Sequence, residues 1–489
     1  MCWTAEETIV KLSKPLSDDV ITLSTIDQHA LRIYSKFVIV FKTEGEDQIR
    51  DGIRALKRGL AKALCEHPDF ATQIVQKPGS TRKELELRIG PESGVQLRTV
   101  DHSSRIDESQ DCHELLRGRR YADLERGNFP LTDVPEELFF IPHADPEDFC
   151  PAGVPALLVQ ANVLDGAIIL GISWHHSVSD ACGMNTMCRA WAQATNIACT
   201  EGEAWNPDEP TTDNSFERWR LSYGTRATIA EFPEYVVEES ARSPGPNSQH
   251  LLDRKFIAYE ACKVSMWHFS AESMQSFTEL LNSAGQGNEQ RYTQVEAISA
   301  LLWKHLSRAR RLETSFPGGS SLFTTRVDYR SRMSPPLPQK FIGNINQPVP
   351  RVRLSLREVC AASTPQSLAE LAGVIRKTVS ESGDKEVRKL VGFIDSLPGV
   401  VDLDLNFNTC PGPDVAITDL SGLDLMRHEW GMHLGRPICI RGFVRYKGFA
   451  AFFPKMFEGG RQLHMQCEAA AVERLKADPV FTRYAQFLY

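Results

Sequence analysis

The chain contains 489 residues, of which 42% are hydrophobic and 24% are charged, and its formal net charge is −8. This composition is ordinary for a globular protein and excludes a disordered, fibrous or collagen-like chain. The acidic balance argues against nucleic acid as a partner, because contact with a phosphate backbone needs a basic surface. A single hydrophobic core stops growing at about 250–300 residues, so we expect two domains.

The N-terminus places two acidic residues where a secretory signal has positive charge. The most apolar stretch, 154–174, is interrupted by Gln160, Asn162 and Asp165, so it cannot span a bilayer. A long chain without a secretory signal needs no disulfide framework for its 12 cysteines. We therefore expect a cytoplasmic protein with reduced thiols and no membrane partner.

The first clear element is an amphipathic helix over 47–68. Apolar residues repeat along one of its faces, namely Ile49, Ile53, Leu56, Leu60 and Leu64. Basic residues occupy much of the remaining surface, which fits either a solvated face over a core stripe or a helix lying on a membrane. The negative charge of the whole chain favours the solvated face.

A β-hairpin is predicted over 155–174. Val159, Ala161 and Val163 alternate with polar residues, and Asp165-Gly166 supplies a tight turn. The return strand, 167–174, is almost entirely apolar, as a strand buried on both faces would be.

A helix is predicted after the polar corner that follows this strand. Its apolar stripe has helical spacing and is interpreted as core, not as a cofactor site: Met184, Met187, Cys188 and Trp191.

The segment 200–254 is rich in proline and polar residues and is interpreted as a linker that crosses between the domains. We therefore expect an N-terminal domain over 1–199 and a C-terminal domain over 255–489. In the second half, Thr293 and Glu296 form a capping box that opens a helix through Arg311. A hairpin over 448–467 and a helix over 470–477 follow. Strands interleave with helices in both halves, so the predicted class is α/β or α+β with mixed sheets.

The candidate catalytic residue is His176, which stands four residues before Asp180 at the corner between the buried strand and the next helix. A histidine at the end of a buried strand is costly unless it is hydrogen-bonded or used, and it can serve as a general base near neutral pH. Asp180 can accept backbone N–H bonds at the helix start and remain charged. The alternative is a satisfied buried histidine beside a capping aspartate. A zinc site with Cys182 and Cys188 lacks suitable ligand spacing, so no metal is expected.

The run His-His-Ser-Val-Ser-Asp-Ala-Cys-Gly between strand and helix resembles the H-x-x-x-D-G core of the BAHD acyltransferases, especially their fungal relatives the trichothecene O-acetyltransferases. Other segments resemble the family in the same order along the chain: 23–28, 295–310, 327–344 and 417–437. These matches are collinear over almost the whole chain, which is more specific than any single motif.

The resemblance implies a two-domain fold related to chloramphenicol acetyltransferase, with an active-site channel at the domain interface. Acyl-CoA, expected to be acetyl-CoA, is the co-substrate, and the acceptor is an alcohol or amine of a fungal-type secondary metabolite. His176 would act as the general base, Asp180 would hold the loop, and Thr418 is a candidate donor to the oxyanion. An ordinary strand threonine is an equal alternative for Thr418. The resemblance further implies a monomer without a permanent cofactor, and it assigns no CoA-contacting residues.

Three positions depart from the family pattern. Ala181 replaces a glycine after Asp180, and Leu420 replaces a tryptophan after Thr418. Glu429 replaces an aspartate of the family pattern. Glu429, Trp430 and Gly431 correspond to a segment that is interpreted as structural, in which Glu429 is expected to pair with Arg330 or Arg332.

Two rival functions remain open on the sequence. His175, His176 and Asp180 also resemble the H-H-x-x-x-D-G motif of peptide-synthetase condensation domains, which take acyl groups from carrier proteins. The departures at Ala181 and Leu420 also allow a non-catalytic binding protein on the same fold.

Overall fold

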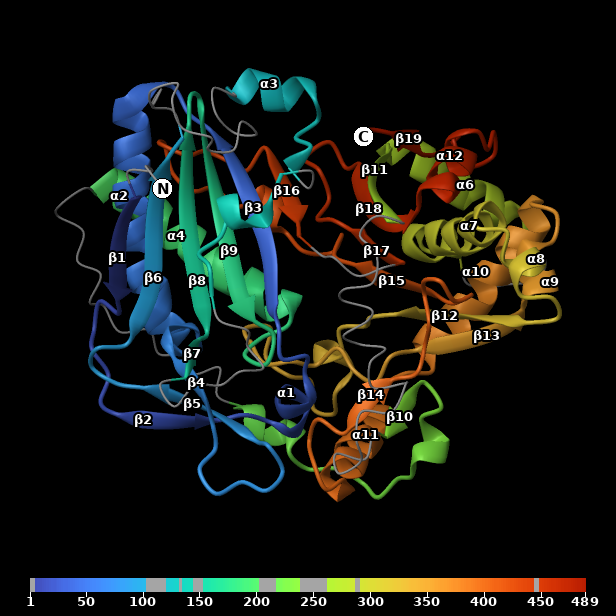
Figure 1. Ribbon diagram of the computed structural model, residues 1–489, viewed down its shortest axis with the longest axis horizontal. Helices are drawn as coiled ribbons and strands as arrows, with labels where there is room; N and C mark the ends of the chain where they lie inside the picture. The colour runs from blue at the N-terminus through green and yellow to red at the C-terminus, as the bar shows by residue number, and fades with distance from the viewer. Residues whose placement is uncertain are drawn as a thin grey trace.

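The computed structural model describes residues 5–102, 120–131, 134–143, 153–201, 217–237, 262–285, 291–443 and 448–489. Two lobes lie side by side, each built on a mixed sheet with helices packed against it (Figure 1). This arrangement confirms the predicted class. Within the described ranges, no helix has the length and apolarity needed to cross a membrane.

The sheet of the first lobe has the strand order β1-β6-β8-β9-β3-β16. β6 and β8 are parallel and the other neighbours are antiparallel. The strand bounds are β1 Ala5–Lys11, β6 Gly94–Asp101, β8 Leu157–Leu164, β9 Ala167–His175, β3 Tyr34–Lys42 and β16 Cys439–Gly442. Because β16 pairs with β3, the second half of the chain supplies an outer strand of the first lobe's sheet.

β8 and β9 form the predicted hairpin, with Gly166 at a φ of 82° in the turn. β9 is buried along its whole length, as its apolar sequence indicates. The polar side chains of β8, Gln160 and Asn162, are also buried. Hydrogen bonds compensate for this burial, because Gln160 Nε2 donates to Leu138 O and Asn162 Nδ2 donates to Phe139 O. The segment around α3 (Tyr121–Arg126) therefore covers the face of the sheet that carries Gln160 and Asn162.

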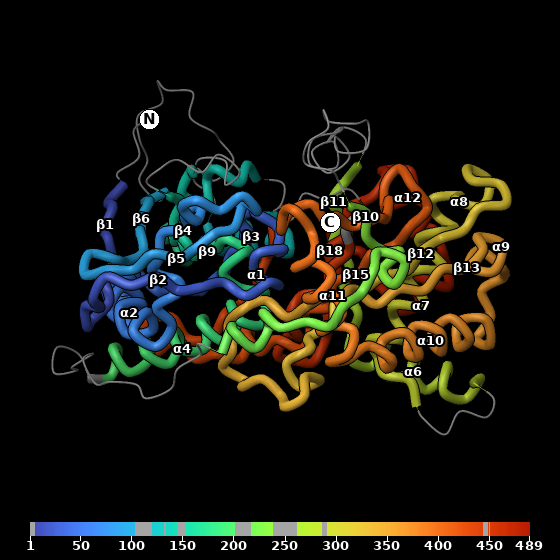
Figure 2. Tube along the Cα trace, turned by 90° about the horizontal axis from the view of Figure 1, so that it is seen from below, coloured from blue at the N-terminus to red at the C-terminus, as the bar shows by residue number. Residues whose placement is uncertain are grey.

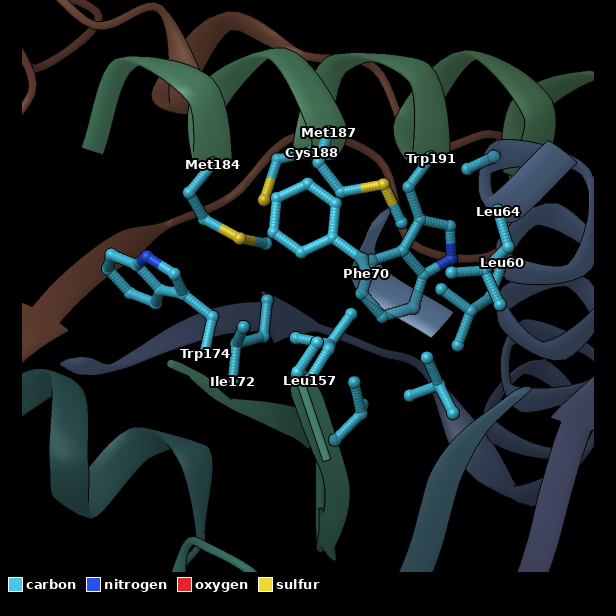
Figure 3. Close-up of a cluster of buried hydrophobic side chains, with 14 of the residues drawn as sticks. Leu60, Leu64, Phe70, Leu157, Ile172, Trp174, Met184, Met187, Cys188 and Trp191 are labelled. Atoms are coloured by element: carbon cyan, nitrogen blue, oxygen red, sulfur yellow. The ribbon is translucent and has the colours of Figure 1, made fainter. Parts of the chain in front are cut away.

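Helices α2 (Gly45–Glu66) and α4 (Ala181–Glu201) pack against each other and cover the opposite face of this sheet (Figure 2). From α4, the predicted stripe of Met184, Met187, Cys188 and Trp191 points toward the strands, where it meets Trp174, Ile172 and Leu157 (Figure 3). These side chains are at most 7% exposed, so the core interpretation of the stripe is confirmed.

A small sheet beneath the first lobe has the order β2-β5-β4-β7, next to the short helix α1. Its strands are β2 Asp19–Thr22, β5 Leu85–Ile89, β4 Gln73–Gln76 and β7 Val154–Pro155, and α1 spans Thr25–His29. Of the predicted linker 200–254, only 200, 201 and 217–237 are described. That part holds the end of α4, two 3₁₀ turns (Glu217–Leu221 and Ile229–Glu231) and β10 (Tyr235–Val237), which pairs with β14 (Leu403–Leu405).

The second lobe has the strand order β13-β12-β15-β17-β18-β11-β19. Its strands are β13 Arg351–Ser355, β12 Ser320–Thr325, β15 Val415–Asp419, β17 Phe449–Phe452, β18 Arg461–Glu468, β11 Cys262–Phe269 and β19 Gln486–Phe487. Its helices are α6 Ala271–Ala284, α7 Gln294–Ala309, α8 Leu312–Ser315, α9 Leu356–Cys360, α10 Pro365–Ser380, α11 Asp384–Ser396 and α12 Ala469–Lys476. The predicted capping box of α7, the β17–β18 hairpin and α12 are all present.

Candidate active site

His176 follows the last residue of β9, where its backbone N–H donates to Ile33 O at 2.8 Å. The preceding residue, His175, is fully buried and its ring meets Tyr34 edge-on at 5.5 Å. Burial lowers the pKa of His175 to about 3. His176, in contrast, is partly exposed. Of the two adjacent histidines, the fold therefore makes His175 a core residue and leaves His176 accessible.

The tautomer of His176 is set by Asn344, which comes from the second half of the chain. The Asn344 side-chain nitrogen donates to His176 O at 2.8 Å and to Asp27 Oδ1 at 3.0 Å. With the amide nitrogen committed to two acceptors, the amide oxygen faces His176 Nδ1 at 3.1 Å. A neutral imidazole has one N–H, so that proton lies on Nδ1 and donates to Asn344. The lone pair of His176 is thereby placed on Nε2, which has no hydrogen-bond partner among the described residues.

Burial also lowers the pKa of His176, although part of the side chain is accessible. A hydrogen bond to its own backbone, the negative charge of Asp180 and the bond to Asn344 oppose this effect in part. The net lowering keeps the ring neutral near pH 7, which is the state that a general base requires.

A buried chain of charges supports Asn344. Asp27 Oδ1 also accepts the backbone N–H of Asn344 at 2.7 Å, and Asp27 Oδ2 accepts Arg218 at 2.7 Å. Arg218 binds Asp69 at 2.9 Å and donates to Val178 O at 2.8 Å, within the loop that carries His176. These charged side chains are at most 3% exposed, so they compensate one another inside the protein. Arg218 belongs to the described part of the predicted linker, which thus reaches the site.

Asp180 forms the predicted helix cap and, in addition, a buried ion pair. Its Oδ1 accepts the backbone N–H of Gly183 at 2.9 Å at the start of α4. Arg330 binds both carboxylate oxygens, at 2.8 and 3.1 Å, and the backbone N–H of Ile345 donates at 3.0 Å. Burial alone would raise the pKa of Asp180, but Arg330 and these hydrogen bonds outweigh it and lower the pKa. The carboxylate is therefore charged and holds the two lobes together beside His176.

The same arginine holds the segment that carries Asn344, which has no regular secondary structure. Arg330 Nε donates to Phe341 O and its Nη2 donates to Gly343 O, both at 2.9 Å. Arg330 therefore ties Asp180 and the backbone around Asn344 into one unit.

The residues after Asp180 accommodate the departure at Ala181. Ala181 is the first residue of α4, and its φ is not positive, so a glycine is not needed there. The close approach occurs two residues later, at Gly183, where an added Cβ would lie 2.2 Å from Ile342 O. The requirement for glycine in this turn thus rests on Gly183.

Thr418 lies in β15 and is partly exposed. It pairs with Ala451, which pairs with His464, so these three residues share one face of the second sheet. Gln462, on that face of β18, accepts a hydrogen bond at 2.7 Å from Arg441 of the first lobe's β16. Thr418 therefore lies on the sheet face turned toward the first lobe, outside the hydrogen-bond network around His176.

The predicted ion pair of Glu429 with Arg330 or Arg332 is wrong. Arg330 is committed to Asp180, and Glu429 instead pairs with Arg436 at 3.0 Å, where both side chains are about half exposed. The reason is that Glu429 lies in a loop that packs on the first lobe: the adjacent Trp430 is fully buried, 5.3 Å from the ring of Trp191. Gly431 continues this loop close to α4, where an added Cβ would lie 2.6 Å from Cys199 Sγ.

Sequence reasoning missed three residues of the site: Asn344, Asp27 and Arg218. The first two stand within segments that resemble the BAHD family, so their signal was present without a role. Arg218 stands in the proline-rich segment and offered no signal. The spatial convergence of these residues is visible only in the fold.

The chain resembles known acyltransferases in its sequence. A family model described as "Transferase family" matches residues 123–391, and one described as "Trichothecene 3-O-acetyltransferase-like N-terminal domain" matches residues 33–195. Acyltransferase easC of Emericella nidulans is 44% identical, covering 99% of this chain and 98% of that protein. Acyltransferase cm3D of Cordyceps militaris is 42% identical over 99% of both chains. A crystal structure of F. graminearum TRI101 complexed with coenzyme A and T-2 mycotoxin is 19% identical with a TM-score of 0.74, covering 96% of this chain and 100% of that chain.

Proposed function

The chain belongs to the Transferase family of BAHD-type acyltransferases, and on that basis we propose that it transfers an acyl group from acyl-CoA to a hydroxyl group of a small molecule, with His176 as general base. The observation that carries the proposal is the tautomer of His176. Asn344 commits Nδ1 as a donor, so the accessible ring presents its basic nitrogen, Nε2.

In the first step, Nε2 takes the proton of the acceptor hydroxyl while its oxygen attacks the thioester carbonyl carbon. The C–O bond forms and a tetrahedral oxyanion results. When the carbonyl re-forms, the C–S bond breaks and CoA leaves as a thiolate, which takes the proton back from His176. The acyl group moves in one addition and one elimination, and His176 is restored to its neutral form.

The imidazolium that exists between these steps is stabilised by its surroundings. Its Nδ1–H donates to Asn344, whose amide is itself bound to the Asp27 carboxylate. The charge of Asp180 also favours the protonated ring. Asp180 is a positioning residue in this scheme, because Arg330 and two backbone N–H groups occupy its carboxylate.

We infer that Thr418 donates a hydrogen bond to the oxyanion. The position of Thr418 supports this role, because it lies on the face of the second sheet that is turned toward the first lobe. The channel expected between the lobes would pass this face and end at His176.

The acceptor class follows from the relatives. TRI101 has been crystallised with coenzyme A and the T-2 mycotoxin, a small molecule, and trichothecene 3-O-acetyltransferases act on oxygen. We therefore propose acetyl-CoA as the donor and a hydroxylated fungal-type secondary metabolite as the acceptor. We also infer a monomer, since one chain supplies both sides of the site, His176 and Asn344. The cytoplasmic location expected from the N-terminal sequence is part of the same proposal.

The test is acyl transfer from a panel of acyl-CoA thioesters to small alcohols, followed by release of the CoA thiol and by mass spectrometry of the product. We expect His176→Ala to lose about 10²–10⁴-fold in rate, as removal of a general base does. His433→Ala, at a partly exposed histidine whose carbonyl accepts from Gln48, is the matched control and should keep its activity. Activity of His176→Ala within about tenfold of wild type would exclude general-base catalysis by this residue.

The same assay separates the rival functions. Transfer from a loaded carrier protein without transfer from acyl-CoA would indicate condensation-type chemistry. Saturable binding of acyl-CoA without thiol release, across all acceptors, would indicate a binding protein. Both outcomes would overturn the proposal.

A further inference from the structure

A serine, a histidine and an aspartate are joined by hydrogen bonds in the second lobe, among helices α7, α10 and α12, whose positions are shown in Figure 1. His305 of α7 has both ring nitrogens engaged. Its Nδ1 lies 2.6 Å from Asp478 Oδ2, and its Nε2 lies 2.9 Å from Ser363 Oγ. The first site does not use any of these residues.

The direction of each hydrogen bond follows from the acid. The Oδ1 atom of Asp478 accepts the backbone N–H groups of Val480 and Phe481 at 2.9 and 3.1 Å, which fixes the carboxylate. Burial alone would raise the pKa of Asp478, but the bond to His305 and these backbone bonds lower it, so the group is an acceptor. Nδ1 of His305 therefore carries the proton, Nε2 is the acceptor, and Ser363 Oγ–H donates to it.

The environment of the ring favours this state. His305 has a side-chain exposure of 1%, and burial lowers its pKa, which keeps it neutral near pH 7. Ser363, at the other end, is partly exposed and can meet a reagent from solvent. A partly exposed acid, a buried neutral imidazole and a partly exposed hydroxyl in this order are the parts of a serine nucleophile with its base.

The segment that carries Ser363 is held firmly by cations. The Lys304 ammonium donates to Val359 O and Ala361 O at 3.0 and 3.2 Å, and Arg308 donates to Cys360 O at 2.9 Å. Ser363 also stands immediately before Thr364, the N-cap of helix α10. Positive charge and a helix N-terminus near the hydroxyl favour the negative charge that develops when it attacks a carbonyl.

We propose that Ser363, His305 and Asp478 form a second, serine-based acyl-transfer site that reacts with small esters or thioesters independently of His176. Ser363 Oγ forms a bond to the acyl carbonyl carbon while its proton passes to His305 Nε2. The bond from that carbon to the leaving oxygen or sulfur breaks, and the leaving group takes the proton from His305. Water reverses these steps on the Ser363 ester and releases the acid. The substrate is small because Ser363 is only partly exposed.

The experiment treats the full chain with a fluorophosphonate and, separately, with p-nitrophenyl acetate, and locates the adduct by peptide mass spectrometry. We expect the adduct on Ser363, formed at a rate that rises with pH as His305 loses its proton. Ser363→Ala should abolish it, and Asp478→Asn, which removes the partner of Nδ1, should slow it by about 10²–10⁴-fold.

Two controls separate this site from the first. Ser380→Ala, at an exposed serine at the far end of α10 whose hydroxyl donates to Lys377 O, should leave labelling unchanged. His176→Ala should keep the Ser363 adduct, and Ser363→Ala should keep acyl transfer from acyl-CoA. Absence of an adduct on Ser363, or an adduct whose rate does not change in Asp478→Asn, would overturn the proposal.

Discussion

The carboxylate of Asp27 accepts two hydrogen bonds from Asn344, one from its backbone N–H at 2.7 Å and one from its side chain at 3.0 Å. These bonds leave the amide oxygen of Asn344 facing His176 Nδ1. Asp27, in the short helix α1, thus fixes through Asn344 that the proton of the neutral His176 ring lies on Nδ1. The relationship joins residues 317 positions apart in the chain.

Asn344→Ala should lower kcat more than it changes KM, because the imidazole loses the partner that fixes its tautomer. The expected loss is about 10–100-fold, typical of removing a residue that orients a catalytic ligand. The hydrogen bond that His176 Nδ1–H donates to Asn344 raises the pKa of His176, so its removal should move the acidic limb of the pH–rate profile to lower pH. Asn185→Ala, which removes a part-buried bond to Asp424, is the control. A loss of the same size in both variants would contradict a specific role for Asn344.

Asp180→Asn should destabilise the protein by about 3–5 kcal/mol, because it leaves Arg330 buried without a full counter-charge. The loss is measured as the free energy of unfolding in denaturant. Glu429→Gln offers the matched comparison, since the Glu429–Arg436 pair is about half exposed and should contribute no more than about 1 kcal/mol. Equal effects of the two substitutions would mean that burial does not set the strength of the Asp180–Arg330 pair.

Gly183→Ala should disrupt the site, whereas the same substitution at Gly373, which also lies in a helix, should not. The added Cβ would stand 2.2 Å from Ile342 O, so the segment that carries Asn344 must move. Gly373→Ala in α10 places its Cβ 3.4 Å from the Tyr292 hydroxyl and should stabilise the helix by about 0.5–1 kcal/mol. Thermal unfolding and acyl-transfer rates of the two variants test this difference in sign.

Stability should fall in acid because of His175. Its pKa is about 3 in the folded chain and about 6.5 in the unfolded chain, so the folded state binds fewer protons. The contribution of His175 is complete above about pH 6.5 and is lost at about 1.4 kcal/mol per pH unit as the pH falls toward 3. In His175→Asn, whose amide oxygen can still accept the Ser177 N–H, the slope of unfolding free energy against pH should decrease by that amount. An unchanged slope would show that His175 is not the group that titrates.

The local elements and the segments that form the site could be predicted from the residues alone. Alternation and the Asp165-Gly166 turn predicted the β8–β9 hairpin, helical spacing predicted the Met184–Trp191 stripe, and the capping box predicted the start of α7. These features depend on residues close in the chain, whose periodicity reports directly on which side is buried. The resemblance to the BAHD family further picked out His176, Asp180 and Arg330.

Which of these residues contact one another depends on how distant segments of the chain pack together. In the folded chain, Arg330 pairs with Asp180 and not with Glu429. Arg218, from the proline-rich segment, pairs with Asp27, and β16 joins the sheet of the first lobe. The fold also assembles Ser363, His305 and Asp478, which share no sequence pattern. The physical reason is that ion pairing and hydrogen bonding between distant segments depend on where each backbone packs and how much water remains there, and neither is encoded in the spacing of neighbouring residues.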